Sequence, residues 1–330
     1  MAEQLKADLV LEGGGVKGIG LLGAVLALDK AGYRFPRIAG TSAGAIVASL
    51  VAAWQKAGRE MSELVEVMNS VQYRKFAGGS ILERASGRLG EGVELLLHEG
   101  AHSGNYLIDW LGPQLEQAGV TTFRDLETVD LQSSLADYQR YSLVVHVSDL
   151  SRRALVRLPW DYSQYGKEAG QQRVVDAVRA SISIPFYFRP VQFDSASGTV
   201  TWVDGGLLSN FPITVFDRTD GKPARWPTWG VKLSAEPNAT ADRQVRTALG
   251  IAITCLETLT SDWNRYRLAE EGVNRRTIYV DTTGVSATDF GIDKSVRDRL
   301  FANGQSAAER FLAKRPPQES LVPGSTGPAR

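Results

Sequence analysis

Apolar residues near the N-terminus follow two patterns, which alternate along the chain. Residues 7–11 and 35–39 are short β-prone runs, and the first is typical of a buried strand. Residues 19–28 carry isoleucine and leucine at helical spacing, whereas residues 45–54 are apolar all round, as a buried helix is. Strand, helix, strand and helix in this order predict an α/β fold with a mostly parallel sheet and helices on both faces.

The later part of the chain continues this alternation. Residues 107–119 have leucines at every fourth position and predict a helix, and residues 141–148 predict a buried strand. Further elements are a helix over 174–181, a strand over 199–203 and a long helix over 241–272.

Two stretches differ from this pattern. Residues 71–104 are interrupted by glycines, a composition suited to a mobile cap over a site or to an ordinary surface insertion. Residues 315–330 are rich in Pro, Ser and Gly and are expected to be disordered. We therefore expect one domain over residues 1–314, with 71–104 as its candidate cap.

Composition limits the class of function. Apolar residues make up 43% and charged residues 22% of 330 positions, and the net charge is zero, so nothing indicates nucleic-acid binding. No stretch reaches the roughly 18 apolar residues of a membrane span. The first residues lack the apolar region of a secretory signal, so we expect a cytoplasmic protein. Peripheral membrane contact and export without a cleavable signal stay open.

A glycine-rich loop follows the first predicted strand and precedes a helix. Its backbone N–H groups would be exposed at the N-terminus of that helix. Such a position favours a bound phosphate or an oxyanion. The spacing also satisfies a dinucleotide-binding pattern, but the next strand ends in Ala39 and Gly40 and offers no carboxylate for a ribose. A Walker A loop is excluded, because it needs Gly-Lys-Ser or Gly-Lys-Thr and the sequence contains neither. The loop comprises Gly13, Gly14, Gly15, Val16, Lys17 and Gly18.

A G-x-S-x-G pattern follows the second predicted strand. In such a turn, flanking glycines let the backbone bend sharply and lift the serine hydroxyl clear of it. The alternative is an ordinary strand-to-helix turn in which the serine caps the helix. The pattern comprises Gly40, Thr41, Ser42, Ala43 and Gly44, with Ser42 as the candidate nucleophile.

A serine nucleophile needs a base, and the chain offers few. His98 and His102 lie in the glycine-punctuated stretch, and His146 lies in an apolar strand, where a hydrogen-bonded core histidine is expected. Asp204 is better placed, because it follows a β-prone run and precedes Gly205 and Gly206. An Asp-Gly turn residue without a catalytic role is the alternative.

Together these segments resemble the patatin-like phospholipases. The loop at 13–18 is similar to that family's oxyanion-hole block, the turn at 40–44 to its nucleophile block, and residues 204–206 to its catalytic-aspartate block. Residues 180–186 resemble a further segment that ends in proline, and the similarity extends over about residues 7–312. One departure is Lys17, where the family more often has arginine.

The resemblance implies a three-layer patatin-like fold and a lipid acyl hydrolase with a Ser42–Asp204 dyad. Asp204 would take the hydroxyl proton as Ser42 attacks, and the N–H groups of Gly14, Gly15 and Val16 would hold the oxyanion. Such an enzyme needs no metal and no organic cofactor. Its partner would be a lipid or acyl ester at a membrane or micelle surface.

Two other functions use the same residues. An acyltransferase would pass the acyl group from Ser42 to an alcohol or thiol instead of water. A lipid-binding or partner-binding protein could keep the fold without turnover, although intact Ser42 and Asp204 argue against it. Headgroup, acyl length and oligomeric state are not determined by the sequence.

Overall fold

The computed structural model describes residues 4–76, 104–129, 136–185, 187–196, 198–218, 220–234 and 271–315. Several expectations therefore fall wholly or mostly outside the described residues. These are the cap beyond residue 76, His98, His102, the helix over 241–272 apart from its end, and the tail beyond residue 315.

The N-terminal part alternates strand and helix as predicted. Its main elements are β2 (Asp8–Leu11), α1 (Gly18–Lys30), β4 (Ile38–Thr41) and α2 (Ala43–Ala57). β2 and β4 pair in parallel, and all their residues are buried, as expected of strands covered on both faces. β4 begins later than predicted, after Pro36, which has no N–H to donate to a ladder.

The rest of the described chain contains the predicted elements together with several that were not predicted. A short pair, β1 (Leu5–Lys6) and β3 (Tyr33–Arg34), forms a separate two-stranded sheet. The other strands are β5 (Leu143–Asp149), β6 (Ala154–Leu158), β7 (Val191–Ser195), β8 (Gly198–Asp204), β9 (Thr228–Lys232) and β10 (Thr277–Tyr279). The other helices are α3 (Leu64–Asn69), α4 (Tyr73–Phe76), α7 (Asn105–Gln117), α8 (Val174–Ser181), α9 (Gly206–Ser209), α11 (Glu271–Arg275) and α12 (Lys294–Ala313).

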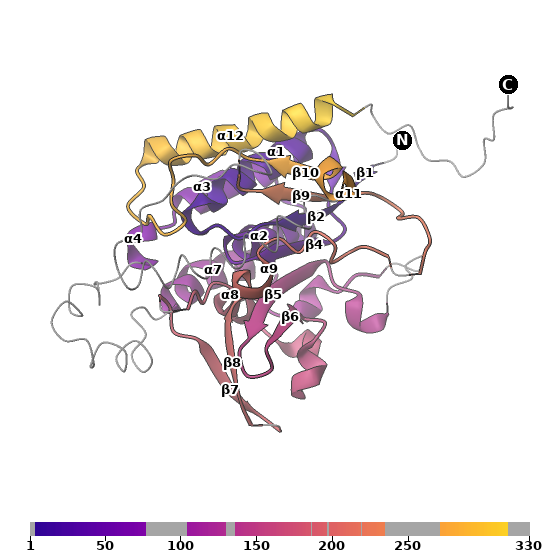
Figure 1. The fold of residues 1–330 in the computed structure, drawn as a ribbon, viewed down its shortest axis with the longest axis vertical. Coiled ribbons are helices and arrows are strands. Elements are labelled where there is room, and N and C mark those ends of the chain that lie inside the picture. Colours follow the sequence, from indigo (N-terminus) through magenta and orange to yellow (C-terminus); the bar gives the residue numbers. More distant parts are fainter. Residues whose placement is uncertain are drawn as a thin grey trace, which may run out of the picture.

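The main sheet has the order β10-β9-β2-β4-β5-β8-β7, and β6 also pairs with β5. The predicted parallel arrangement holds from β10 to β5, whereas β6, β7 and β8 are antiparallel to their neighbours. Short turns join β5 to β6 and β7 to β8, and strands joined by such turns are antiparallel. In Figure 1 the sheet runs from β10 beside α12 to β7 at the opposite end.

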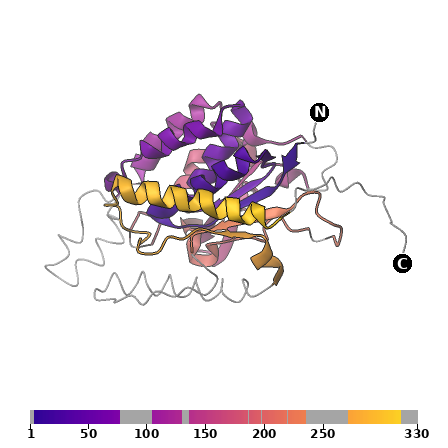
Figure 2. The same ribbon diagram turned by 90° about the horizontal axis from the view of Figure 1, so that it is seen from above.

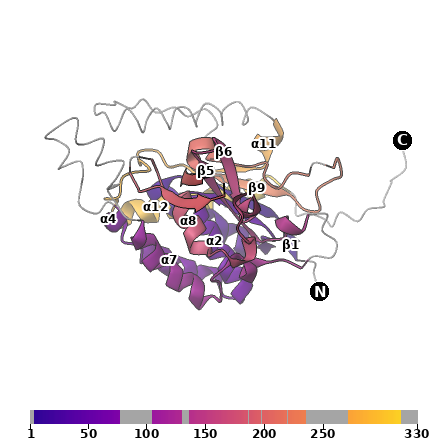
Figure 3. The ribbon, with the colours of Figure 1, turned by 90° about the horizontal axis from the view of Figure 1, so that it is seen from below.

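Helices cover the sheet on both sides, which confirms the predicted α/β class. Seen from above, the indigo and magenta helices lie together on one side (Figure 2). From below, α2 and α7 lie on that side and α11 lies on the other (Figure 3). Among the described residues, no helix combines the length and the apolar character that a bilayer crossing requires.

The first and last described helices pack closely against each other. A Cβ on Gly23 of α1 would lie 2.1 Å from the Phe301 carbonyl oxygen, and one on Gly304 of α12 would lie 2.0 Å from the Gly20 carbonyl oxygen. Glycine at both positions therefore permits a backbone approach that any side chain would block. This contact fixes the C-terminal helix over the helix that follows the glycine loop.

Candidate active site

The register of β5 brings the candidate nucleophile and base together. Thr41, the last residue of β4, pairs with His146, and Asp204, the last residue of β8, pairs with Val147. Because β6 occupies the other edge of β5 over residues 145–149, β4 and β8 must share one edge. The two strands approach from opposite directions and end beside consecutive residues of β5. Ser42 and Asp204, 162 positions apart in the sequence, therefore lie side by side.

The turn at Ser42 has the strained geometry that the motif predicts. Ser42 has φ 52°, a value that costs a non-glycine residue roughly 1–3 kcal/mol. A Cβ on Gly40 would lie 2.3 Å from the Gly44 carbonyl oxygen, and a Cβ on Gly44 would lie 2.3 Å from the Leu11 carbonyl oxygen. Both glycines are thus required by backbone contacts, while Ala43 begins α2.

Ser42 does not act as an ordinary helix cap. It stands at the N-cap position of α2, yet its side chain accepts no capping hydrogen bond. Its backbone N–H donates to Ser181 Oγ at 2.9 Å, and that hydroxyl donates to the His146 carbonyl at 2.7 Å. The backbone of the turn is therefore fixed while the Ser42 hydroxyl remains available for chemistry.

The glycine loop lies directly against the serine turn. A Cβ on Gly13 would be 3.1 Å from Ser42 Cβ, and a Cβ on Gly18 would be 3.2 Å from Ala43 Cβ. Gly15 has φ +55°, and a Cβ there would meet the Ala287 carbonyl oxygen at 2.0 Å. Lys17 closes the short helical turn of the loop by donating its N–H to the Gly14 carbonyl at 3.1 Å.

The N–H groups of the loop differ in their availability. Val16 was expected to be an oxyanion donor, but its N–H donates to the Ala287 carbonyl at 3.0 Å. The Gly13 N–H donates to the Asn210 carbonyl at 3.1 Å. No described residue is recorded as accepting from the N–H of Gly14 or Gly15. These two glycines are thus the loop residues whose N–H groups are not used within the described structure.

Asp204 is buried and only partly hydrogen-bonded. Its Oδ1 accepts the Gly206 N–H at 2.7 Å, but Oδ2 has no partner of hydrogen-bond geometry among the described residues. Burial raises the pKa of Asp204 to about 7, against the opposing effects of the Ser42 side chain and the Gly206 N–H. Gly205 has no room for a side chain, because a Cβ would lie 2.3 Å from the His146 carbonyl oxygen.

Three further residues hold the site together. Asn210 Nδ2 donates to the Gly13 carbonyl at 3.1 Å, so Asn210 contacts the loop through both its side chain and its backbone. The Glu12 carboxylate forms an ion pair with Lys232 and accepts the Leu233 N–H at 2.6 Å. Ser181 lies in the segment that resembles a family block, which is the one signal that could have marked it. Nothing in the sequence marked Asn210 or Glu12, because their partners lie about 200 residues away along the chain.

His146 differs from its expectation in one respect. It is buried, at 1% exposure, as predicted, but neither ring nitrogen has a partner of hydrogen-bond geometry among the described residues. Burial lowers the pKa of His146 to about 4, so the ring is neutral at neutral pH. No hydrogen bond within the described ranges joins it to Ser42, and no three metal-ligating side chains cluster there.

Comparison with known proteins extends this picture. A family model described as patatin-like phospholipase matches residues 9–217. The chain is 31% identical over 309 residues to "Uncharacterized protein YqhO" of Bacillus subtilis (strain 168), a match that covers 92% of this chain and 97% of that protein. The crystal structure of VipD from Legionella pneumophila is similar with a TM-score of 0.50 and 19% identity, over 94% of this chain and 67% of that chain. The type III effector ExoU of Pseudomonas aeruginosa matches with a TM-score of 0.48 and 17% identity, over 94% of this chain and 53% of that chain.

Proposed function

The chain belongs to the patatin-like phospholipase family, and we propose that it is a lipid acyl hydrolase, a carboxylic ester hydrolase with a Ser42–Asp204 dyad. One observation carries the proposal: the buried Asp204 carboxylate lies beside the Ser42 side chain with Oδ2 unpartnered among the described residues. A base in that position can take a proton from the hydroxyl without first losing another hydrogen bond.

In the first half-reaction, Ser42 Oγ attacks the carbonyl carbon of the acyl ester while its proton moves to Asp204. The carbonyl oxygen becomes an oxyanion, which accepts hydrogen bonds from the N–H groups of Gly14 and Gly15. Each such donor contributes about 3 kcal/mol in enzymes of this kind. The intermediate then expels the alcohol, which takes the proton from Asp204, and an acyl-Ser42 ester remains.

In the second half-reaction, Asp204 accepts a proton from water as the water oxygen attacks the acyl-Ser42 carbonyl. The same two N–H groups hold the second oxyanion. Its collapse releases the fatty acid, and the proton on Asp204 returns to Ser42 Oγ. A carboxylate with a pKa near 7 suits both directions of transfer, because it is a stronger base than an ordinary aspartate and still ionised in part at neutral pH.

The test is release of free fatty acid from phospholipid, lysophospholipid and p-nitrophenyl acyl esters by the wild type and by Ser42→Ala. We expect release by the wild type and a loss of at least about 10³-fold in Ser42→Ala. Ser49→Ala is the matched control, because Ser49 is a buried serine of the same helix whose hydroxyl donates to the Ile46 carbonyl at 2.8 Å. Equal release by wild type and Ser42→Ala would contradict the dyad. An acylated alcohol or thiol in place of free acid would indicate a transferase.

A further inference from the structure

A cavity of about 490 Å³ lies among side chains other than those of the proposed dyad. Its walls are formed by Arg37, by side chains of β5 and β6 that include His146 and Arg157, and by residues within 209–218 and 220–226. Neither Ser42 nor Asp204 is among its lining residues. The volume lies in the range of small-molecule sites, roughly 300–1,000 Å³. The cavity is therefore large enough for a ligand and separate from the proposed dyad.

Three arginines of the wall are held in the same way. Arg37, Arg157 and Arg218 each direct Nε and Nη2 to one aspartate: Asp8, Asp161 and Asp220, respectively. A guanidinium has five N–H donors, and this pairing leaves those on Nη1. No acceptor for these Nη1 groups is recorded among the described residues. The arginines are thus fixed in place and retain donors that suit an anion.

Two buried nitrogen-bearing side chains in the same wall have no hydrogen-bond partner among the described residues. They are the imidazole of His146 and the indole Nε1 of Trp160. Buried polar groups in native proteins are nearly always hydrogen-bonded, and the Gly40 backbone lies beside the His146 ring without reaching hydrogen-bond geometry. Both residues line the cavity, but their ring nitrogens lie beneath its surface and are closed to solvent.

Part of the wall is apolar and aromatic, and its other lining residues are polar or acidic: Thr128, Gln139, Ser209, Thr214, Asp217 and Asp220. Trp160 and Phe216 pack edge to face with ring centroids 6.1 Å apart. Arg37 lies 4.7 Å from the centre of the Phe216 ring, and Arg225 lies 4.6 Å from that of Trp226. Flat apolar surfaces beside fixed cations would bind a molecule with both characters.

We propose that this cavity is a second, non-catalytic site for a small amphipathic anion: one acidic group on a flat or aliphatic apolar body. The acidic group binds the arginine Nη1 donors, and the apolar body packs on Trp160, Phe216 and Leu155. Binding here requires no turnover at Ser42, so it can be tested whether or not the chain hydrolyses esters.

The probe is 8-anilinonaphthalene-1-sulfonate, a monoanion with an aromatic body, titrated into the full-length protein and followed by its own fluorescence and by equilibrium dialysis. We expect saturable binding with one site per chain. Displacement by laurate and by phenyl phosphate, measured separately, shows whether a carboxylate or a phosphate is the better acidic group.

Two variants locate the probe. Ala224→Phe narrows the cavity at its rim, and Arg218→Gln removes a cation whose partner, Asp220, is partly exposed. We expect each to weaken binding about tenfold, the effect of one charge-assisted contact. Ala302→Phe and Arg299→Gln are the matched controls, because both positions are exposed on α12 and neither lines the cavity.

The outcomes separate clearly. Weakening by both cavity variants, with both controls like the wild type, supports the site. Unchanged affinity in both cavity variants, each shown by circular dichroism to be folded, places the probe elsewhere and overturns the proposal. Absence of saturable binding by the wild type also overturns it.

Discussion

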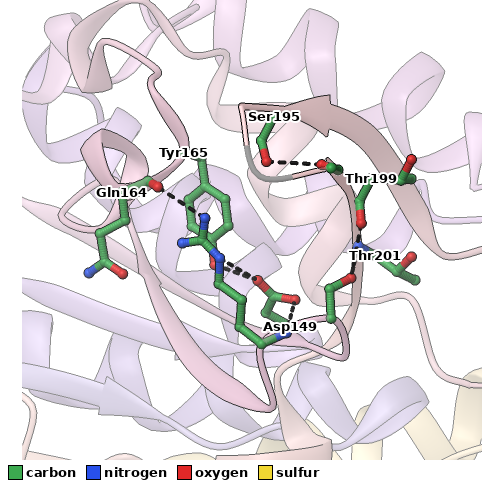
Figure 4. Close-up of polar contacts among 9 residues, drawn as sticks. Asp149, Gln164, Tyr165, Ser195, Thr199 and Thr201 are labelled. Carbon is green, nitrogen blue, oxygen red and sulfur yellow. Dashed lines mark hydrogen bonds and ion pairs between the residues drawn. The ribbon is translucent and has the colours of Figure 1, made fainter.

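Two aspartates end neighbouring antiparallel strands and differ in what surrounds their carboxylates. Asp149 ends β5 and Asp204 ends β8, and they are 1% and 5% exposed. Asp149 is fully engaged (Figure 4): its Oδ2 accepts the Tyr165 hydroxyl at 2.7 Å and its Oδ1 accepts the Arg152 N–H at 3.0 Å. Asp204 has one backbone donor, and its Oδ2 is unpartnered among the described residues.

The groups around Asp149 join the end of β5 to neighbouring segments and so stabilise the fold. The Arg152 guanidinium lies 4.2 Å from the centre of the Tyr165 ring and donates to the Gln164 carbonyl at 3.2 Å, so it ties the loop after β6 to the end of β5. Ser151 and Thr201 join the same strand end to β8 through a hydrogen bond of 3.0 Å. The same residue type at similar burial is thus a structural clamp when both oxygens are paired and a candidate base when one is not.

The sharpest difference should appear in turnover. Asp204→Asn keeps the Oδ1 acceptor for Gly206 but cannot accept the Ser42 proton, so kcat/KM on a p-nitrophenyl ester should fall about 10³–10⁴-fold. Asp149→Asn should leave kcat/KM per folded molecule within about threefold, because Asp149 takes no part in the proposed proton transfer. A comparable loss in both variants would mean that the two carboxylates do not have separate roles.

Stability should respond to the clamp. In Asp149→Asn the Tyr165 hydroxyl must turn to accept from the new amide NH2, and the Arg152 N–H keeps only a neutral carbonyl oxygen as its acceptor. We expect the free energy of unfolding to fall by about 3 kcal/mol, measured by urea denaturation at pH 7. Asp194→Asn, an exposed site on β7, is the control and should change it by less than about 0.5 kcal/mol. An unchanged free energy of unfolding in Asp149→Asn would contradict a structural role for Asp149.

The pH dependence of activity should reflect Asp204. The base must be ionised, and its pKa is raised to about 7, so kcat/KM should rise about tenfold per pH unit below 7 and level off above it. At pH 5 the value should be about one hundredth of the plateau. The measurement is hydrolysis of a soluble p-nitrophenyl ester in buffers of constant ionic strength. A flat profile between pH 5 and 8 would exclude a base with this pKa.

The smallest expected effect is a gain in the free energy of unfolding in Asp204→Asn, whereas Asp149→Asn should lower that free energy. The pKa of Asp204 is raised from 3.8 to about 7 in the folded chain, so folding favours the protonated form. Its contribution to stability is present below pH 3.8 and is lost as the pH rises through 7. Asparagine does not ionise, so Asp204→Asn avoids the destabilisation that comes from ionising the buried carboxyl. We expect the free energy of unfolding of this variant at pH 8 to be higher by about 2 kcal/mol. The gain should vanish at pH 4, and an equal gain at both pH values would point to another cause.

Local sequence patterns predicted much of the fold and part of the site. The helix predicted over 174–181 coincides with α8, and the strand predicted over 199–203 lies within β8, which ends at Asp204. The turn at Ser42 was predicted because its glycines and flanking elements are neighbours in the sequence. The antiparallel placement of β8 was not predicted, because pairing between distant strands depends on the whole sheet.

The sequence by itself determined the order of strands and helices, the glycine loop, the bend at Ser42 and the aspartate at a strand end, because each depends on residues within one turn or strand. Only the tertiary structure decided which polar atoms have partners. It engages the Val16 N–H with Ala287, holds Gly13 with Asn210, and pairs Asp149 while leaving Asp204 Oδ2 without a partner among the described residues. Hydrogen bonding and burial arise from contacts between segments far apart in the chain, and these contacts set the pKa of a carboxylate and thereby its chemistry.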